Sequence, residues 1–150
     1  MKKILIIILV CVITIVTICF AWYTEYSKQK YEVTKVNNEF LAYEKSIVKI
    51  NTIVSLMNKA IDLNNKNKIS KDENNMYVEN DKNSIKVYLK VKSSDSTMEM
   101  EKLMLDKKAG VEKVEYAFSD LIFEVSDVQY HKKTGQVKSI TFKEKESISF

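Results

Sequence analysis

The sequence contains no proline and no arginine, and its 150 residues include only two glycines, two cysteines and one histidine. Without arginine, the chain lacks the side chain best suited to bidentate binding of phosphate or carboxylate groups. Gly110 and Gly135 are far apart, so the chain has no glycine-rich phosphate loop. His131 alone cannot supply a catalytic triad or a multi-histidine metal site, and we expect it to be an exposed neighbour of a turn. These absences predict a protein that is not an enzyme and has no cofactor or metal.

Cysteine content and charge exclude two further classes. Cys11 and Cys19 both lie inside an apolar run, about 12 Å apart along a helix, which is too far for a disulfide between them. The rest of the chain therefore has no disulfide and relies on its core. The 24 basic residues are nearly balanced by 20 acidic ones, and this balance argues against a nucleic-acid partner.

The longest apolar run covers residues 4–22 and contains no charged side chain. As a helix it would be about 28 Å long, close to the thickness of a hydrocarbon core. Two lysines precede the run and three aromatic residues lie at or just beyond its end: Lys2, Lys3, Trp22, Tyr23 and Tyr26. This arrangement predicts a single-pass anchor in the cell membrane, with the lipid bilayer as a partner. Residues 1–3 would form a cytoplasmic tip, and the C-terminal domain would be extracytoplasmic.

Two other interpretations of this segment stay open. Cys19-Phe20-Ala21 resembles a cleavage site, so the run could belong to a removed signal peptide, although it is longer than the usual apolar region of such peptides. A lipoprotein signal fits less well, because Val10 and Ile18 precede the cysteines where a small residue is needed. A type IV pilin leader is missing, since no glycine precedes the run.

A second apolar pattern begins after the anchor. It follows steps of three and four residues over four heptads, through Val33, Val36, Phe40, Tyr43, Ile47, Ile50, Val54, Met57 and Ile61. The pattern fits a self-associating coiled coil or a helix packed on its own domain. Its second half widens, which favours packing on a sheet. We therefore predict a membrane-proximal helix over residues 23–46 and an extracytoplasmic α+β domain over residues 47–150. β-branched residues would allow a break between Ser46 and Thr52.

The first half of this stripe is the candidate contact surface. If it lies beyond the sheet, its apolar edge is exposed and suits a second copy or a membrane protein partner. The residues are Val33, Val36, Phe40 and Tyr43. On this hypothesis, Phe40→Asp should destabilise the domain less than Ile61→Asp.

The middle of the chain alternates between loop and regular patterns. Residues 64–83 are polar and predict a solvated loop; Asp72 and Asn74 begin a calcium-like series that Met76 breaks. Residues 84–92 alternate apolar and polar side chains, which predicts a strand with one buried face. A capping box over Ser96–Glu99 predicts a short helix that contains Leu103, Met104 and Leu105 and ends at Gly110. Val111, Val114 and Phe118 then predict further helical turns.

Residues 121–145 predict a β-hairpin. Residues 132–135 would be its turn, with Gly135 in the left-handed conformation, and Val125 would pair with Phe142. This register places one apolar group on one face, namely Leu121, Phe123, Val125, Ile140 and Phe142. A second group near the turn lies on the opposite face, namely Val128, Tyr130 and Val137.

Two stretches carry a resemblance. Phe40-Leu-Ala-Tyr43-Glu with residues 53–65 is one, and residues 120–142, including Val128-Gln-Tyr-His-Lys-Lys-Thr-Gly135, are the other. With the anchor they resemble small single-pass membrane proteins of low-GC Gram-positive bacteria, and the layout is also similar to that of pilins. The resulting fold is α+β, with a long N-terminal helix on a small antiparallel sheet and a helical insertion. The function we expect is that of a structural or interaction protein, such as a pilin-like subunit of a surface assembly; the alternative is an extracytoplasmic ligand-binding module.

Overall fold

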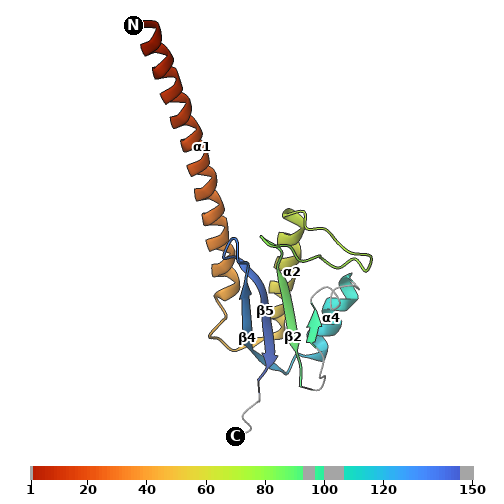
Figure 1. Ribbon diagram of the computed structural model, residues 1–150. Coiled ribbons are helices and arrows are strands. Elements are labelled where there is room, and N and C mark those ends of the chain that lie inside the picture. Colours follow the sequence, from red (N-terminus) through yellow and green to blue (C-terminus); the bar gives the residue numbers. More distant parts are fainter. Residues whose placement is uncertain (1, 93–96, 100–106, 146–150) are drawn as a thin grey trace. The chain divides into compact units, whose positions relative to one another are not determined.

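A computed structural model describes residues 2–92, 97–99 and 107–145 (Figure 1). The chain divides into two compact units, Met1–Lys35 and Val36–Phe150. The second unit has an α+β fold, as the sequence predicts. Its regular elements, together with the first helix, are α1 (Lys2–Leu41), β1 (Val48–Lys49), α2 (Ile50–Lys66), β2 (Lys86–Lys90), β3 (Thr97–Glu99), α4 (Lys107–Ala117), β4 (Ile122–Tyr130) and β5 (Val137–Glu144).

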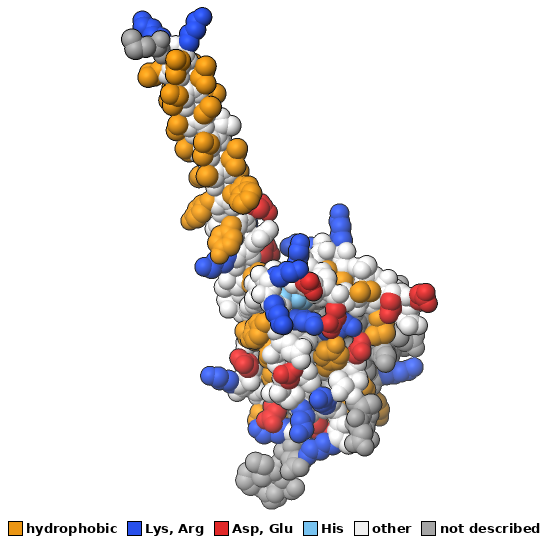
Figure 2. All heavy atoms as spheres, in the orientation of Figure 1, with side chains coloured by type: hydrophobic (Ala, Val, Ile, Leu, Met, Phe, Trp, Pro, Cys, Tyr) orange, Lys and Arg blue, Asp and Glu red, His pale blue; other side chains and the backbone are white. Residues whose placement is uncertain are grey.

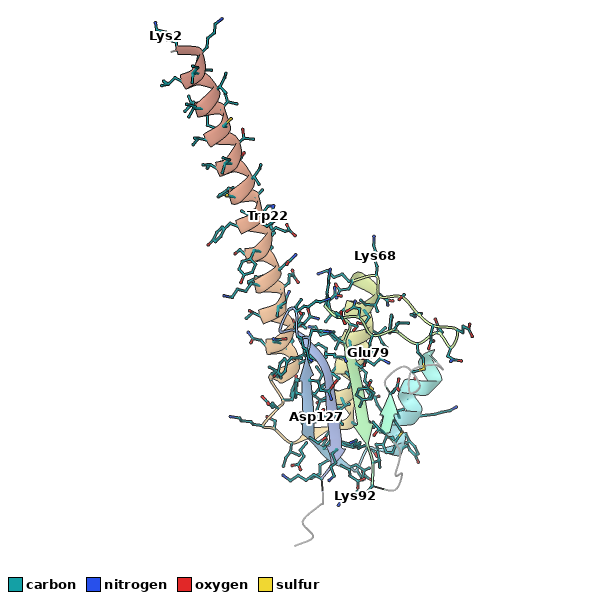
Figure 3. All side chains as sticks on the ribbon, viewed as in Figure 1. Lys2, Trp22, Lys68, Glu79, Lys92 and Asp127 are labelled. Atoms are coloured by element: carbon teal, nitrogen blue, oxygen red, sulfur yellow. The ribbon has the colours of Figure 1, made fainter. Side chains whose placement is uncertain are left out.

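The first unit is made by α1, in which no glycine or proline interrupts the helical hydrogen bonds. Thr14 Oγ1 donates to the Val10 carbonyl at 2.6 Å, so this polar side chain is satisfied within its own helix. The apolar side chains from Ile4 to Trp22 are exposed, and Figure 3 shows Lys2 and Trp22 projecting from the helix. Within the described residues, α1 is the one helix long and apolar enough to cross a membrane. Its length and composition fit an anchor and a signal sequence equally.

The helix ends earlier than predicted. α1 stops at Leu41, turns follow through Ser46, and α2 begins at Ile50, so the predicted end of the membrane-proximal helix at residue 46 is wrong. The break lies within 42–49 and overlaps the predicted interval. β-branched Val48 takes an extended conformation there and pairs with Phe123 of β4.

The sheet has five strands in the order β1-β4-β5-β2-β3 and is mixed, so the purely antiparallel prediction is wrong. β2 and β5 are parallel, with Val87 opposite Ile140 and Leu89 opposite Phe142, whereas the other neighbours are antiparallel. Parallel neighbours require a long connection, and residues 91–136, which include α4, supply it. Sequence alternation identified β2 but contains no information on its partner.

One face of the sheet packs against α2, which lies behind the strands in Figure 1. The core contains side chains with no exposed area from α2, β2 and β5, namely Ile53, Met57, Ala60, Val87, Leu89, Ile140 and Phe142. The predicted alternation of β2 is confirmed, because Ile85, Val87, Leu89 and Val91 are buried. Burial of these apolar side chains is the main stabilising contribution to this unit.

The predicted helical insertion is correct only in its second part. Thr97–Glu99 forms β3, in which Met98 pairs with Leu89, so the capping box at this position is wrong. The open edge of β2 explains the difference, because pairing with it satisfies backbone groups that would otherwise lack partners. Leu103, Met104 and Leu105 lie outside the described residues. Gly110 lies inside α4 and does not end it.

The hairpin is confirmed, including its four-residue turn and the pairing of Val125 with Phe142. Gly135 has a φ of +70°, as predicted. Two register shifts leave Ser126 of β4 and Lys138 of β5 without a directly opposite residue. Because opposite residues share a face, the shifts bring both apolar groups of the hairpin to the α2 side. The prediction of opposite faces for Val128, Tyr130 and Val137 is therefore wrong.

Candidate functional site

The structure places the predicted contact stripe in different environments. Val33 is half-buried and belongs to the first unit, whereas the other three residues belong to the second. Val36 is 5% exposed and Phe40 is fully buried, and Tyr43 packs partly against the same core. The expected exposure is thus wrong for Val36 and Phe40, because the end of α1 covers apolar residues of its own unit. Val36 and Phe40 are therefore not accessible to a partner, and the exposed surfaces of the second unit lie elsewhere.

One such surface follows the outer edge of β4. β1 pairs only with Ile122 and Phe123, and no described strand covers the edge of β4 from residue 124 to residue 130. A cleft of about 410 Å³ lies along this edge. It is lined by Glu44, Lys45, Val125, Ser126, Asp127, Val128 and Tyr130. We call it the β4-edge cleft.

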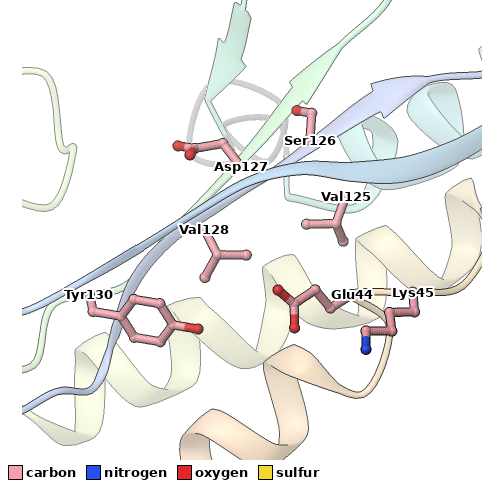
Figure 4. Close-up of a pocket in the computed structure, with 7 residues that line it drawn as sticks. All are labelled: Glu44, Lys45, Val125, Ser126, Asp127, Val128 and Tyr130. Atoms are coloured by element: carbon pink, nitrogen blue, oxygen red, sulfur yellow. The ribbon is translucent and has the colours of Figure 1, made fainter.

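Figure 4 shows how its side chains are arranged. Val125, Val128 and Tyr130 point to the side of β4 on which Glu44 lies, and Asp127 points to the opposite side. The register shift at Ser126 produces this grouping, since without it Val125 and Val128 would lie on opposite faces. The cleft therefore combines an open backbone edge, an apolar strip and exposed charges. An extended peptide needs these features in order to add to a sheet.

A second cleft, of about 450 Å³, lies beside the hairpin turn. Its lining is polar apart from one tyrosine ring and consists of Asn80, Asp81, Gln129, Tyr130, His131, Lys132, Lys133 and Lys138. We call it the turn cleft. The ammonium of Lys133 lies 2.9 Å from an Asp81 carboxylate oxygen, and the ammonium of Lys138 lies 2.7 Å from a Glu79 carboxylate oxygen. Glu79 is labelled in Figure 3, in the loop that precedes β2.

His131 is buried, with 3% of its surface exposed, so the expectation of an exposed turn neighbour is wrong. Its Nε2 lies 2.7 Å from the Ser84 carbonyl, which only accepts, so Nε2 carries a hydrogen and donates. The ring thus ties the hairpin to the segment before β2. Figure 2 shows its pale-blue surface among lysine and acidic side chains.

The charges in the turn cleft act on Asp81. The hydrogen bond from Lys133 lowers the pKa of Asp81, and the charge of Lys133 lowers it further, with smaller contributions from His131 and Lys138. The carboxylate therefore stays ionised to a lower pH than an ordinary aspartate. Positive charge dominates the immediate surroundings of Asp81.

Among residues 2–92, 97–99 and 107–145, no three histidine, cysteine, aspartate or glutamate side chains lie close enough together to bind one metal ion. Asp72 Oδ1 instead accepts hydrogen bonds from the backbone of Asn74 and Met76, so it stabilises a local turn. Comparison of the chain with family models, curated proteins and solved structures gives no match.

Local sequence patterns predict neither of the two clefts. They place the cleft residues that belong to the hairpin only as strand and turn positions. The apolar alternation of β4 was visible, but the register shifts at Ser126 and Lys138 carry no glycine or other marker. The pair Lys132-Lys133 predicts only a turn from the local sequence. Its neighbours Asp81 and Glu79 come from a segment some 50 residues earlier, which local patterns could not connect to it.

Proposed function

We propose that this chain is a membrane-anchored extracytoplasmic interaction protein, in which α1 holds the domain at a bilayer and the β4-edge cleft binds a partner. A subunit of a surface assembly with a pilin-like layout is one form of this function. The observation that carries the proposal is the open edge of β4 beside an apolar strip. The unpaired backbone groups of such an edge can form hydrogen bonds with a strand of another chain.

The occupant we propose is an extended segment of a second protein. β1 already pairs with the start of this edge, and Val48 turns its side chain into the core there. A partner strand that continues the ladder would place alternate apolar residues over Val125 and Val128. A lysine in the partner would complement Glu44, which is exposed and carries the negative charge on this side of the cleft.

Membrane attachment is tested first. The full chain should remain with the membrane after an alkaline carbonate wash. The side of the membrane is tested in a variant in which Cys11 and Cys19 are replaced by serine and Lys68 by cysteine. The new cysteine should react with an impermeant maleimide in intact cells. Release of a soluble species that starts near Trp22 would overturn the anchor and favour a cleaved signal.

The contact surface is tested by photo-cross-linking in native membranes. A photoreactive residue at Tyr130, which is 46% exposed, should form an adduct whose partner peptide is extended and apolar at alternate positions. Tyr116 of α4 is the matched control, since it is 87% exposed and lies away from the cleft residues. Val128→Lys should abolish the adduct at position 130. Equal adducts at both positions, or none at position 130, would overturn the proposed surface.

A further inference from the structure

The turn cleft has a frame held by two segments distant in the sequence, residues 80–84 and the hairpin turn. Thr134 Oγ1 donates to the Lys82 carbonyl at 2.6 Å, and His131 Nε2 donates to the Ser84 carbonyl. Within the first of these segments, Asn80 Oδ1 accepts from three successive backbone N–H groups, those of Lys82, Asn83 and Ser84. A frame with this many hydrogen bonds fixes the backbone that carries the charged side chains. An ordered backbone lowers the entropic cost of binding a ligand, because the cleft does not have to form when the ligand arrives.

The cleft carries more positive than negative charge. Lys133 and Lys138 each have a carboxylate partner, Asp81 and Glu79 respectively. Lys132 also lines the cleft and is exposed, and no described side chain pairs with it. The ammonium of Lys132 is therefore available to a ligand, and Lys133 becomes available if a ligand displaces Asp81. Figure 2 shows lysine side chains around the single histidine on this face.

We propose that the turn cleft binds a phosphate group carried by a hydroxylated molecule, with Lys132 as its main cation and Lys133 as its second. This inference goes beyond the proposed partner contact and does not depend on it. Lysine binds phosphate as a compact point charge and needs no bidentate geometry, so the absence of arginine is no obstacle. A volume of about 450 Å³ exceeds that of a bare phosphate, and the Asp81 carboxylate suits the hydroxyl groups of a larger ligand.

Asp81 gives the proposal a diagnostic feature. Its carboxylate accepts a hydrogen bond from the Lys133 ammonium, so a phosphate group must compete with Asp81 for that ammonium. Replacing the carboxylate with a neutral amide should therefore strengthen binding, whereas removing the Lys132 ammonium should weaken it. A surface that merely attracts anions would respond equally to any change of the same charge elsewhere on the domain.

The test uses the full chain in nanodiscs of neutral phosphatidylcholine, with glycerol 3-phosphate as the probe in calorimetric titration. We expect saturable binding that Lys132→Gln weakens about tenfold, the size of one charge-assisted hydrogen bond. Asp81→Asn should strengthen it about threefold. Lys90→Gln and Asp120→Asn make the same charge changes at exposed positions outside the cleft, and they should leave binding unchanged.

A second set of discs, containing phosphatidylglycerol, distinguishes the source of the phosphate. If a lipid headgroup occupies the cleft, these discs should weaken glycerol 3-phosphate binding in the unaltered chain, and Lys132→Gln should remove that difference. If the ligand is soluble, both kinds of disc should give the same affinity. Absence of binding in both kinds of disc, or equal losses in Lys132→Gln and Lys90→Gln, would overturn the proposal. Either result would leave the cross-linking test at Tyr130 unaffected.

Discussion

Asn37 Oδ1 accepts a hydrogen bond of 2.8 Å from the backbone N–H of Val137, 100 residues further along the chain. The same side chain donates from Nδ2 to the Gly135 carbonyl at 2.9 Å. The amide thus satisfies both a donor and an acceptor of the hairpin, as a neighbouring strand would. This contact joins the end of α1 to the turn that carries the lysines of the turn cleft.

Asn37→Ala should destabilise the second unit by about 1–2 kcal/mol, since it leaves a backbone N–H and a carbonyl without their partner. Asn38→Ala is the control, because Asn38 is exposed on the same helix and should change stability by less than about 0.5 kcal/mol. Urea denaturation of the full chain in neutral nanodiscs, followed by pulse proteolysis, measures both. Equal effects of the two substitutions would show that the Asn37 contact contributes nothing to stability.

Asn64 makes the same kind of contact deeper in the domain. It is fully buried, donates from Nδ2 to the Ile85 carbonyl at 2.8 Å and accepts from the Ile85 N–H at 2.9 Å. Asn64→Ala should cost about 2–3 kcal/mol, more than Asn37→Ala, because the abandoned backbone groups have no access to water. Asn58→Ala, on the exposed face of α2, is the control for helix propensity. If Asn64→Ala lowers the free energy of unfolding by less than Asn37→Ala does, burial does not increase the cost of losing these hydrogen bonds.

These two asparagines show where sequence reasoning stops. Local alternation predicted β2 and the hairpin, because apolar side chains at every second position identify a buried face whatever the partner is. The role of Asn37 depends on Gly135 and Val137, so no window of local sequence contains it. The sequence of Asn64 and its neighbours likewise predicted a polar loop, although the residue is part of the core.

The β4-edge cleft was unpredictable for a related reason. Its apolar strip exists because the register of the hairpin shifts at Ser126 and again at Lys138, and the second shift restores the register lost at the first. A regular hairpin would place Val125 and Val128 on opposite faces. The parallel pairing of β2 with β5 is equally nonlocal, since Val87 and Ile140 show the same alternation in either direction.

Burial reverses the expected order for two substitutions in the predicted stripe. Phe40 is fully buried, whereas Ile61 is only partly buried against the core. Phe40→Asp should therefore destabilise the second unit by about 4 kcal/mol or more, because it removes a large buried ring and introduces an unpaired charge. Ile61→Asp should cost about 1–2 kcal/mol, since its carboxylate can reach water. The same urea assay compares them, and a greater loss for Ile61→Asp would restore the prediction of an exposed stripe.

The final prediction concerns pH. Lys133 lowers the pKa of Asp81 first through a hydrogen bond and then through its charge. A carboxyl group whose folded pKa is depressed contributes stability above its unfolded pKa, and this contribution is lost as pH falls through the folded pKa. Lys133→Gln should therefore raise the pKa of Asp81 towards its ordinary value, so that protonation begins at a higher pH. Carboxyl-carbon NMR titration of the full chain measures this shift directly. Lys90→Gln removes the same charge outside the turn cleft and should leave the pKa of Asp81 unchanged. An equal shift of this pKa in both variants would mean that general surface charge, and not the Lys133 contact, sets it.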